Sequence, residues 1–193
     1  MSRILIAGFL AAIVLFIWGM AAWMVVPLHT PTIAGLPNEA EITKLLKDQN
    51  LQTGVYLAPW SDNEADWSNP ESAWMKNHLA GPLYSIYYQK EGAAPMNAGV
   101  LLGGFIINLL SALLAAWLLS CAAAGSCSSY WQRVGFSAGL GILVGLFGHG
   151  NFWNWGHFPA DYTFAFIIDD LVGWTLAGLV LAGLVRPAPA ATP

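Results

Sequence analysis

Charge is scarce in this chain of 193 residues, of which Asp, Glu, Lys and Arg together make up 9%. Soluble domains carry roughly 25% charged residues. Hydrophobic residues reach 56%, and the mean hydropathy is +0.55. This composition argues against one large soluble core and favours long lipid-facing segments. The net charge is −4 and no basic run occurs, which argues against nucleic-acid binding.

Cysteine and catalytic motifs are nearly absent. Cys121 and Cys127 are the only cysteines, and one such pair makes neither a disulfide framework nor a zinc site. We expect two unpaired thiols on a reducing side of the membrane. The sequence has no Walker loop, Rossmann fingerprint, HExxH, GxSxG or CxxC motif. It therefore predicts no enzyme activity and no cofactor.

One acidic segment has the alternation of a calcium-binding loop. Asp62, Glu64 and Asp66 occupy alternate positions. Trp67 stands where such a loop needs glycine, and Ala73 stands where it needs a bidentate glutamate. The pattern favours a solvated acidic turn and no metal site.

Apolar runs at four places predict transmembrane helices. Together with its flanks, each run approaches the roughly 20 residues that a spanning helix needs. The first is too long for the hydrophobic core of a signal peptide, which is about 7–15 residues, so we expect it to be retained. The predicted spans are Ile4–Val26, Ala98–Ala124, Val134–Gly148 and Tyr162–Val185.

Three arginines predict the orientation of this four-helix bundle. Arg3 precedes the first span, Arg133 lies between the second and third, and Arg186 follows the fourth. An even number of spans places all three on one face, which the positive-inside rule makes cytoplasmic. Both termini are then cytoplasmic, and the Pro/Ala-rich tail, residues 187–193, is predicted to be disordered.

Residues 29–95, between residues 1–28 and residues 96–186, are the only part with the character of a soluble domain. Asn38 and Glu41 form a capping-box variant that predicts a helix ending at Gly54, followed by a strand at 55–57. We therefore expect a small α/β domain between the first and second spans, on the side of the membrane away from the termini.

A second helix and strand follow in this segment. Asn69 and Pro70 predict the start of the helix, Gly81 and Pro82 its end, and residues 83–89 a second strand. Two strands alone are only marginally stable. We expect this domain to rest on the membrane bundle or on another subunit.

Asp169 and Asp170 are the most unusual feature of the sequence, because they are acidic residues inside a predicted membrane span. The run after them, residues 171–185, spans only about 22 Å, so a hydrocarbon core of roughly 30 Å must include the two acids. Neighbours on a helix diverge by about 100°, so the two acids point in different directions. Asp169 shares a face with Gly173, and Asp170 shares one with Phe166.

Two interpretations of these acids stay open. In the first, Asp169 is a proton or cation site that accepts bonds from Trp, Asn or His on a neighbouring helix, with mid-span Asn108 as one partner. In the second, the acids lie near the outer membrane interface, where the N-terminal helix dipole favours them. Asn108 then forms a structural hydrogen bond between helices.

The segment around Trp153 and Trp155 is rich in aromatic side chains and is flanked by His149 and His157. Such side chains are typical of an aromatic belt at the membrane interface. Haem or metal binding by these histidines is the alternative, but no second histidine lies at mid-membrane depth in the predicted layout. The sequence favours the belt.

Small residues at four-residue spacing predict close helix packing. The glycines that we expect at helix contacts are Gly135, Gly139, Gly141, Gly145 and Gly173.

The C-terminal pattern WNW-x-x-F-x-x-D-Y-T, then Asp, then GW-x-LAGLVLA resembles one family of small bacterial inner-membrane proteins with four spans. It is carried by Trp153, Asn154, Trp155, Phe158, Asp161, Tyr162, Thr163, Asp169 or Asp170, Gly173 and Trp174. The likeness extends over nearly the whole chain. It implies a bacterial inner membrane and the layout of four spans, but no activity, because the family is uncharacterised.

Three functions are compatible with these features. The first is a non-catalytic accessory subunit of a larger inner-membrane complex, in contact with lipids and other integral membrane subunits. The second is a small proton, cation or solute transporter that uses Asp169 with Asn108 or Asp170. The third is a metal or enzyme site in the loop domain, with His78 and Asp62 or Asp66. The sequence favours the first.

Overall fold

The computed structural model describes residues 2–123 and 125–186, and it divides the chain into two compact units. Of the described residues, 2–34, 95–123 and 125–186 form the helical unit, and 35–94 form the loop domain. The sequence predicted that the loop domain begins at residue 29. In the structure it begins at residue 35, and residues 29–34 belong to the helical unit. The tail predicted to be disordered, 187–193, lies outside the described residues.

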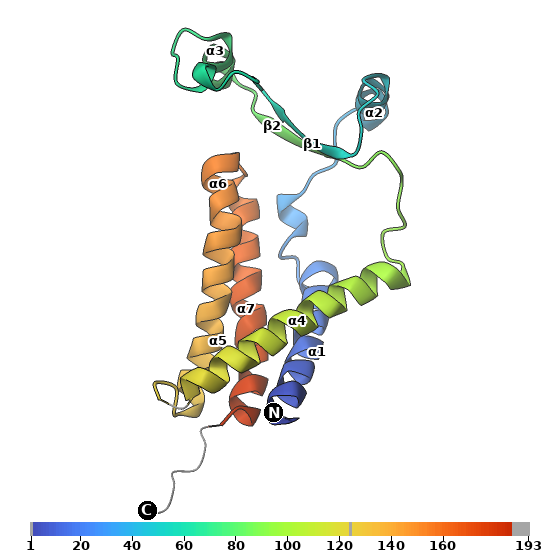
Figure 1. Ribbon diagram of the computed structural model, residues 1–193. Helices are drawn as coiled ribbons and strands as arrows, with labels where there is room; N and C mark the ends of the chain where they lie inside the picture. Colours follow the sequence, from blue (N-terminus) through green and yellow to red (C-terminus); the bar gives the residue numbers. More distant parts are fainter. Residues whose placement is uncertain (1, 124, 187–193) are drawn as a thin grey trace, which may run out of the picture. The chain divides into compact units, whose positions relative to one another are not determined.

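Four helices of the described chain are long and apolar enough to cross a membrane, as predicted (Figure 1). The third is longer than the predicted run at 134–148, because the segment with His149 and the tryptophans stays helical. It consists of α5 (Tyr130–Val144), a π-helical turn η3 (Gly145–Gly150) and α6 (Asn151–Gly156). The other three are α1 (Ser2–Met24), α4 (Ala98–Ala123) and α7 (Ala160–Leu184).

Local signals explain where these helices begin and end. Ser129 and Gln132 form a capping box at the start of α5, and the Asn97 side chain accepts the backbone N–H of Val100 at the start of α4. After α6, His157 adopts a left-handed conformation with φ 54°, and Pro159 precedes α7. The turn between α6 and α7 is therefore short, and these two helices run antiparallel.

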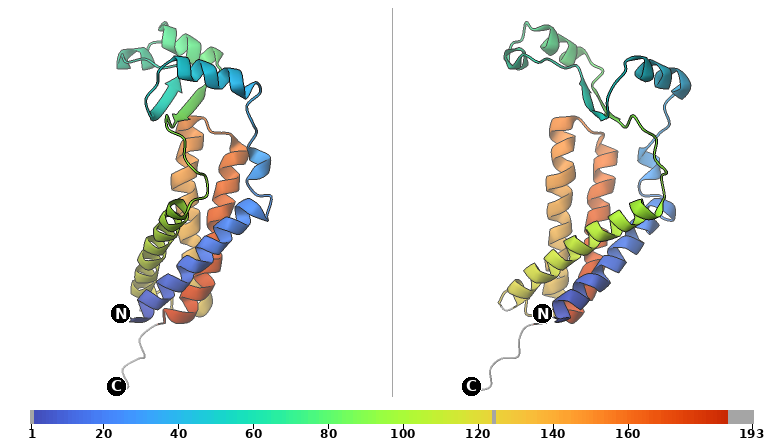
Figure 2. Two further views of the ribbon diagram at one scale, coloured as in Figure 1. Left: turned by 90° about the vertical axis from the view of Figure 1, so that its right-hand side faces the viewer. Right: turned by 45° about the vertical axis from the view of Figure 1, so that its right-hand side comes forward.

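The helical unit is arranged around α7, which packs against both α1 and α5, whereas α4 packs mainly against α1 (Figures 1 and 2). Its core is built mostly from small residues, so the backbones lie close together. The fully buried residues include Ala7, Ala11, Ala12, Ala112, Ala116, Leu119, Ala177 and Leu181.

The predicted packing glycines divide into two groups. A Cβ on Gly141 would lie 2.6 Å from the Asp170 carbonyl oxygen, and one on Gly173 would lie 2.9 Å from the Trp18 ring. Gly145 similarly approaches Ile167 on α7. Gly135 and Gly139, in contrast, face open space, so their assignment to a helix contact was wrong. They lie on the side of α5 away from α7. Spacing alone does not say which face of a helix is covered.

Two more glycines make close contacts that the sequence analysis did not assign. Gly8 on α1 lies against Leu113 of α4, and Gly178 on α7 lies against Ser137 of α5.

The loop domain has two helices and a two-stranded sheet, as predicted. Strands β1 (Gly54–Ala58) and β2 (Tyr84–Tyr88) pair antiparallel, with Tyr56 opposite Ile86. The domain also contains a 3₁₀ turn η2 (Glu64–Trp67) and the helices α2 (Glu39–Asp48) and α3 (Ala73–Ala80).

The helix boundaries in this domain differ from prediction in detail. Asn38 precedes α2 but makes no side-chain cap, so the expected capping box does not form. Helix α2 ends well before Gly54, which instead opens β1. The N-cap of helix α3 is Ser72, whose side chain accepts the Met75 N–H, and not Asn69. A serine hydroxyl with extended backbone is an equally good cap, and it displaces the predicted start.

The acidic segment 62–66 folds as a turn held by its own side chains. Asp66 accepts hydrogen bonds from Ser61 and Asn63, and Asp62 accepts one from the Trp60 indole.

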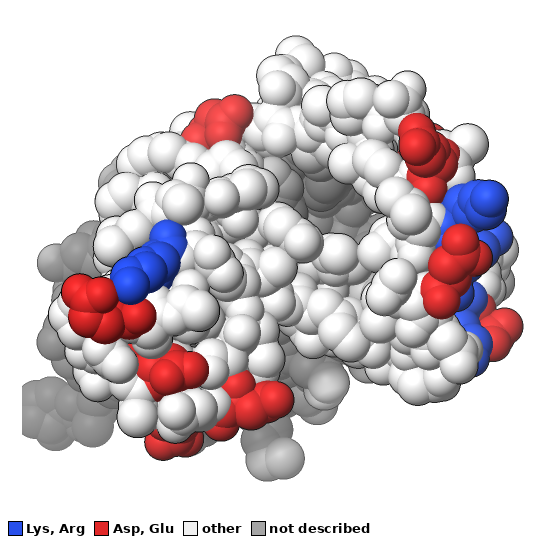
Figure 3. All heavy atoms as spheres, turned by 90° about the horizontal axis from the view of Figure 1, so that it is seen from above, with Lys and Arg blue, Asp and Glu red and all other residues white. Residues whose placement is uncertain are grey.

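Outside the loop domain, the only Asp, Glu, Lys and Arg residues in the sequence are Arg3, Arg133, Asp161, Asp169, Asp170 and Arg186. Seen from above, charged side chains form small separate groups between wide uncharged areas (Figure 3).

Candidate functional site

Asp169 lies well inside α7, not at its N-terminus. It is nine residues after Ala160, or about 14 Å along the helix at 1.5 Å per residue. The dipole effect is confined to the first turn of a helix. The N-terminal dipole therefore does not explain an acid at this depth, and its stabilisation must come from side chains.

Trp18 on α1 supplies the first of these interactions. Its indole Nε1 donates to Asp169 Oδ1 at 2.5 Å and also lies 3.3 Å from the Asp169 carbonyl oxygen. Trp18 can approach because Gly173, one turn further along α7, has no side chain. The predicted common face of Asp169 and Gly173 is therefore the face that packs on α1.

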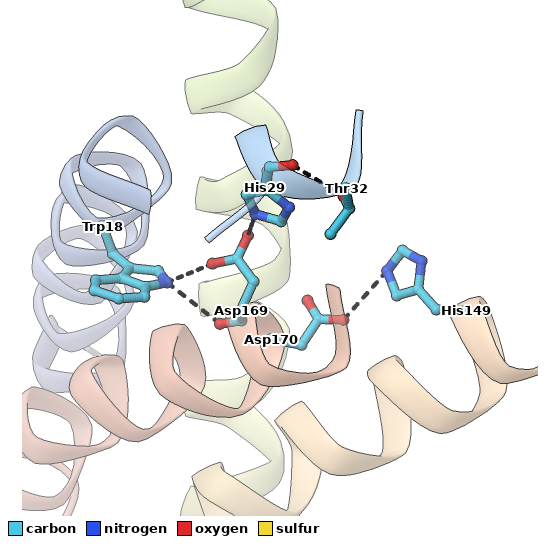
Figure 4. A network of polar contacts seen from close by, with 6 residues as sticks. All are labelled: Trp18, His29, Thr32, His149, Asp169 and Asp170. Carbon is cyan, nitrogen blue, oxygen red and sulfur yellow. Dashed lines mark hydrogen bonds and ion pairs between the residues drawn. The ribbon is translucent and has the colours of Figure 1, made fainter. Parts of the chain in front are cut away.

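His29 supplies the second interaction. Its Nε2 lies 3.0 Å from Asp169 Oδ2, and its side chain is 0% exposed. The residue follows α1 and precedes the 3₁₀ turn η1 (Thr30–Thr32), where the Thr32 hydroxyl donates to the His29 carbonyl oxygen. Figure 4 shows the Asp169 carboxylate between the Trp18 indole and the His29 imidazole.

Aromatic rings enclose the His29 imidazole. The Trp23 ring stacks on it at a centroid distance of 4.3 Å, and the Phe166 ring lies 4.6 Å away. These contacts keep water from a polar ring, so its hydrogen bonds must come from protein groups. Asp169 supplies one of them. His29 Nδ1, however, is buried and has no hydrogen-bond partner among the described residues.

A second pair of similar chemistry lies on a neighbouring face of α7. His149, in the π-helical turn η3, places its Nε2 3.4 Å from Asp170 Oδ2, and its ring lies 4.8 Å from that of Phe166. Asp170 Oδ2 is buried and accepts no hydrogen bond from the described residues. Single π-helical turns occur frequently at functional sites, because they redirect side chains within a helix.

Both acids line a cavity of about 290 Å³ within the helical unit. Their side chains retain 18% exposure for Asp169 and 24% for Asp170. Asn108 and Ser111 of α4 contribute the other polar side chains of this cavity, and no lysine or arginine lines it. Asn108 thus shares a cavity with Asp169, but no hydrogen bond joins the two among the described residues.

The geometry assigns the proton on His29. A carboxylate only accepts hydrogen bonds, so the Nε2 atom that faces Asp169 carries the hydrogen of the neutral imidazole. The unpartnered Nδ1 atom is then a free acceptor. Nδ1 is therefore the ring nitrogen of His29 that has no partner among the described residues, while Nε2 contacts Asp169.

The remaining predicted residues lie apart from this cluster. Trp153 and Trp155 are exposed on α6, and His157 forms the turn after α6. His149, which the sequence assigned to the same belt, instead contacts Asp170. His78 and the acidic turn belong to the loop domain.

Sequence analysis missed two members of the cluster, Trp18 and His29. His29 was assigned to the loop domain because it follows the apolar run, and its return to α7 depends on a tertiary contact. Trp18 had a usable signal: tryptophan prefers the membrane interface, yet Trp18 lies six residues before the end of α1. An indole N–H inside a span needs an acceptor.

No known protein family, curated protein or solved structure matches this chain.

Proposed function

We propose that this chain is a small multi-pass membrane transporter that takes up and releases protons at Asp169 and His29. The observation that carries the proposal is the contact between this carboxylate and a fully buried imidazole whose second nitrogen is free. Ionisable groups are costly inside a membrane, roughly 2.5–3.5 kcal/mol each on insertion scales, and they typically mark ion or proton pathways.

The neighbouring pair supports the same function. Asp170 and His149 meet on a neighbouring face of α7, and both acids reach the cavity that also contains Asn108 and Ser111. The two carboxylates that line this cavity, each in contact with an imidazole, can exchange protons with a cavity solute or with water. We place the protein in a bacterial inner membrane, with cytoplasmic termini and a periplasmic loop domain, as its family resemblance and its arginines imply.

Proton movement in proteoliposomes tests this proposal. With a potassium diffusion potential and a trapped pH-sensitive dye, the wild-type protein is expected to acidify or alkalinise the lumen faster than empty liposomes do. Asp169→Asn keeps the side-chain volume but cannot ionise, so we expect it to reduce the rate by at least about tenfold.

Asp161→Asn is the matched control, because Asp161 is an exposed acid in the first turn of the same helix. It is expected to keep the wild-type rate. Both variants should unfold at temperatures close to that of the wild type. An unchanged rate in Asp169→Asn would contradict the proposal.

A second candidate, an accessory subunit of an inner-membrane complex, has its own support in the loop domain. Among residues 35–94, all of which the structure describes, Ser72 is the only buried one. A domain with so little core gains little hydrophobic stabilisation. Purification in mild detergent, followed by native mass spectrometry, tests this candidate. A stoichiometric second protein would support it, and a chain that purifies alone and moves protons would contradict it.

A further inference from the structure

A second hollow adjoins the polar cavity. It is an apolar groove of about 490 Å³ between α1 and α4. Gly19 on α1 and Asn108 on α4 line both the groove and the polar cavity, so the two spaces are neighbours. The groove is otherwise lined by apolar and aromatic side chains, among them Met20, Met24, Met96, Trp23, Val100 and Ile107.

Together these spaces form an amphipathic site. One end offers the carboxylates of Asp169 and Asp170 with the polar groups of Asn108 and Ser111, and the other end is apolar. Ligand sites typically occupy about 300–1,000 Å³ and combine apolar walls with a few polar groups. Three methionines make the groove adaptable, because methionine is unbranched and flexible.

Charge decides the polar end of the ligand. The cavity contains two acids and no basic residue, so an anionic head group would be repelled. The indole rings of Trp18 and Trp174 also line it, and aromatic faces attract cations. An ammonium group satisfies both features, since it donates charge-assisted hydrogen bonds to carboxylates.

We infer that the joined cavity and groove bind an amphipathic amine, with its ammonium group at Asp169 and Asp170 and its alkyl chain between α1 and α4. This inference rests on the proposed proton-transfer function and names the substrate class for it. The amine and the proton compete for the same carboxylates, so binding of one releases the other. Such competition couples amine movement to proton movement in opposite directions.

Binding of radiolabelled decylamine to the full chain in lipid nanodiscs tests the inference, with empty nanodiscs subtracted. Decylamine is expected to bind saturably. Decanol has the same chain without the charge, and methylamine has the charge without the chain, so each is expected to bind at least about tenfold more weakly. Asp170→Asn is expected to weaken decylamine binding at least about tenfold.

The groove is tested by a pair of neighbouring glycines on α4. Gly104 lines the groove, and a Cβ there would meet only the Phe16 ring at 3.9 Å. Gly104→Leu should fill the groove and weaken decylamine binding at least about fivefold without a backbone clash. Gly103 faces open space and does not line the groove, so Gly103→Leu is the matched control and should bind as the wild type does.

The outcomes separate this inference from the proposed function. No saturable decylamine binding, or wild-type affinity in both Asp170→Asn and Gly104→Leu, overturns the inference even if the protein moves protons. Equal binding of decylamine and decanol also overturns it, because the charge then plays no part. Saturable binding that depends on Asp170 and Gly104 supports the inference, and if no proton flux accompanies it, the proposed transport function fails instead.

Discussion

At the scale of single residues, the site depends on one glycine as much as on its polar groups. Gly173 gives Trp18 the space to reach Asp169, and a Cβ at this position would lie 2.9 Å from the Trp18 ring. The indole ring is rigid and packs between α1 and α7, so it cannot bend away from an added methyl group as a flexible side chain would. The hydrogen bond and the helix contact are therefore linked.

Gly173→Ala tests this link. The added methyl should displace the Trp18 ring, lengthen its bond to Asp169, and destabilise the protein by about 1–3 kcal/mol. Thermal unfolding in detergent measures the loss as a lower midpoint. Gly183→Ala is the control, because Gly183 lies on the same helix and faces open space. It should leave stability unchanged or raise it slightly, since alanine favours helix. Equal unfolding midpoints for the two variants would argue against a close contact between Gly173 and the Trp18 ring.

At the scale of helices, Arg133 fastens the end of α7 to the start of α5. The guanidinium is buried and donates to the carbonyl oxygens of Ala182, Cys127 and Ser128, at 3.1, 3.3 and 2.6 Å. Terminal helix carbonyls lack intrahelical donors and carry partial negative charge. Arg133 therefore satisfies a carbonyl group in the last turn of α7, thirteen residues beyond Asp169. From the sequence, Arg133 contributed only to predicting the orientation of the helices in the membrane.

Arg133→Ala is expected to destabilise the helical unit by about 3 kcal/mol, because three hydrogen bonds from a charged donor are lost and the acceptors Ala182 and Cys127 lie in buried surroundings. Arg186→Ala is the comparison. Arg186 is exposed and, among the described residues, donates to the Gly183 carbonyl oxygen in the last turn of α7. It should cost less than about 1 kcal/mol. Thermal unfolding in the same detergent measures the stability of both variants. Similar losses of stability would show that the Arg133 hydrogen bonds do not hold α5 and α7 together.

At the scale of the whole molecule, the two units differ in how they are stabilised. The helical unit has a continuous core of alanine and leucine, whereas the loop domain has two short strands and almost no buried side chains. A sheet of two strands is marginal in water. We therefore expect the loop domain to be only marginally stable by itself.

The isolated segment 35–94 is therefore expected to be largely unfolded in water. Its amide proton resonances should cluster in a narrow range in an NMR spectrum, because few side chains fix the backbone. The full chain in nanodiscs, labelled in the same segment, provides the comparison. Well-dispersed resonances from the isolated segment would contradict this account, and would also weaken the argument for an accessory subunit.

Much of the architecture follows from the sequence alone. Four apolar runs determined four long helices, because a polar backbone in lipid must satisfy its own hydrogen bonds. The length of the last run required Asp169 and Asp170 to lie inside it, and helical geometry required them to face different neighbours. The strands at 54–58 and 84–88 also followed from local signals.

Only the tertiary structure decided what those acids contact. Trp18, His29 and Asp169 are separated by as many as 151 residues, and no local pattern relates them. The covered faces of the glycines were likewise undetermined, since Gly135 and Gly141 look alike in sequence but only Gly141 contacts α7. Hydrophobicity and helical period act within a segment, whereas a buried hydrogen bond depends on which segments pack together.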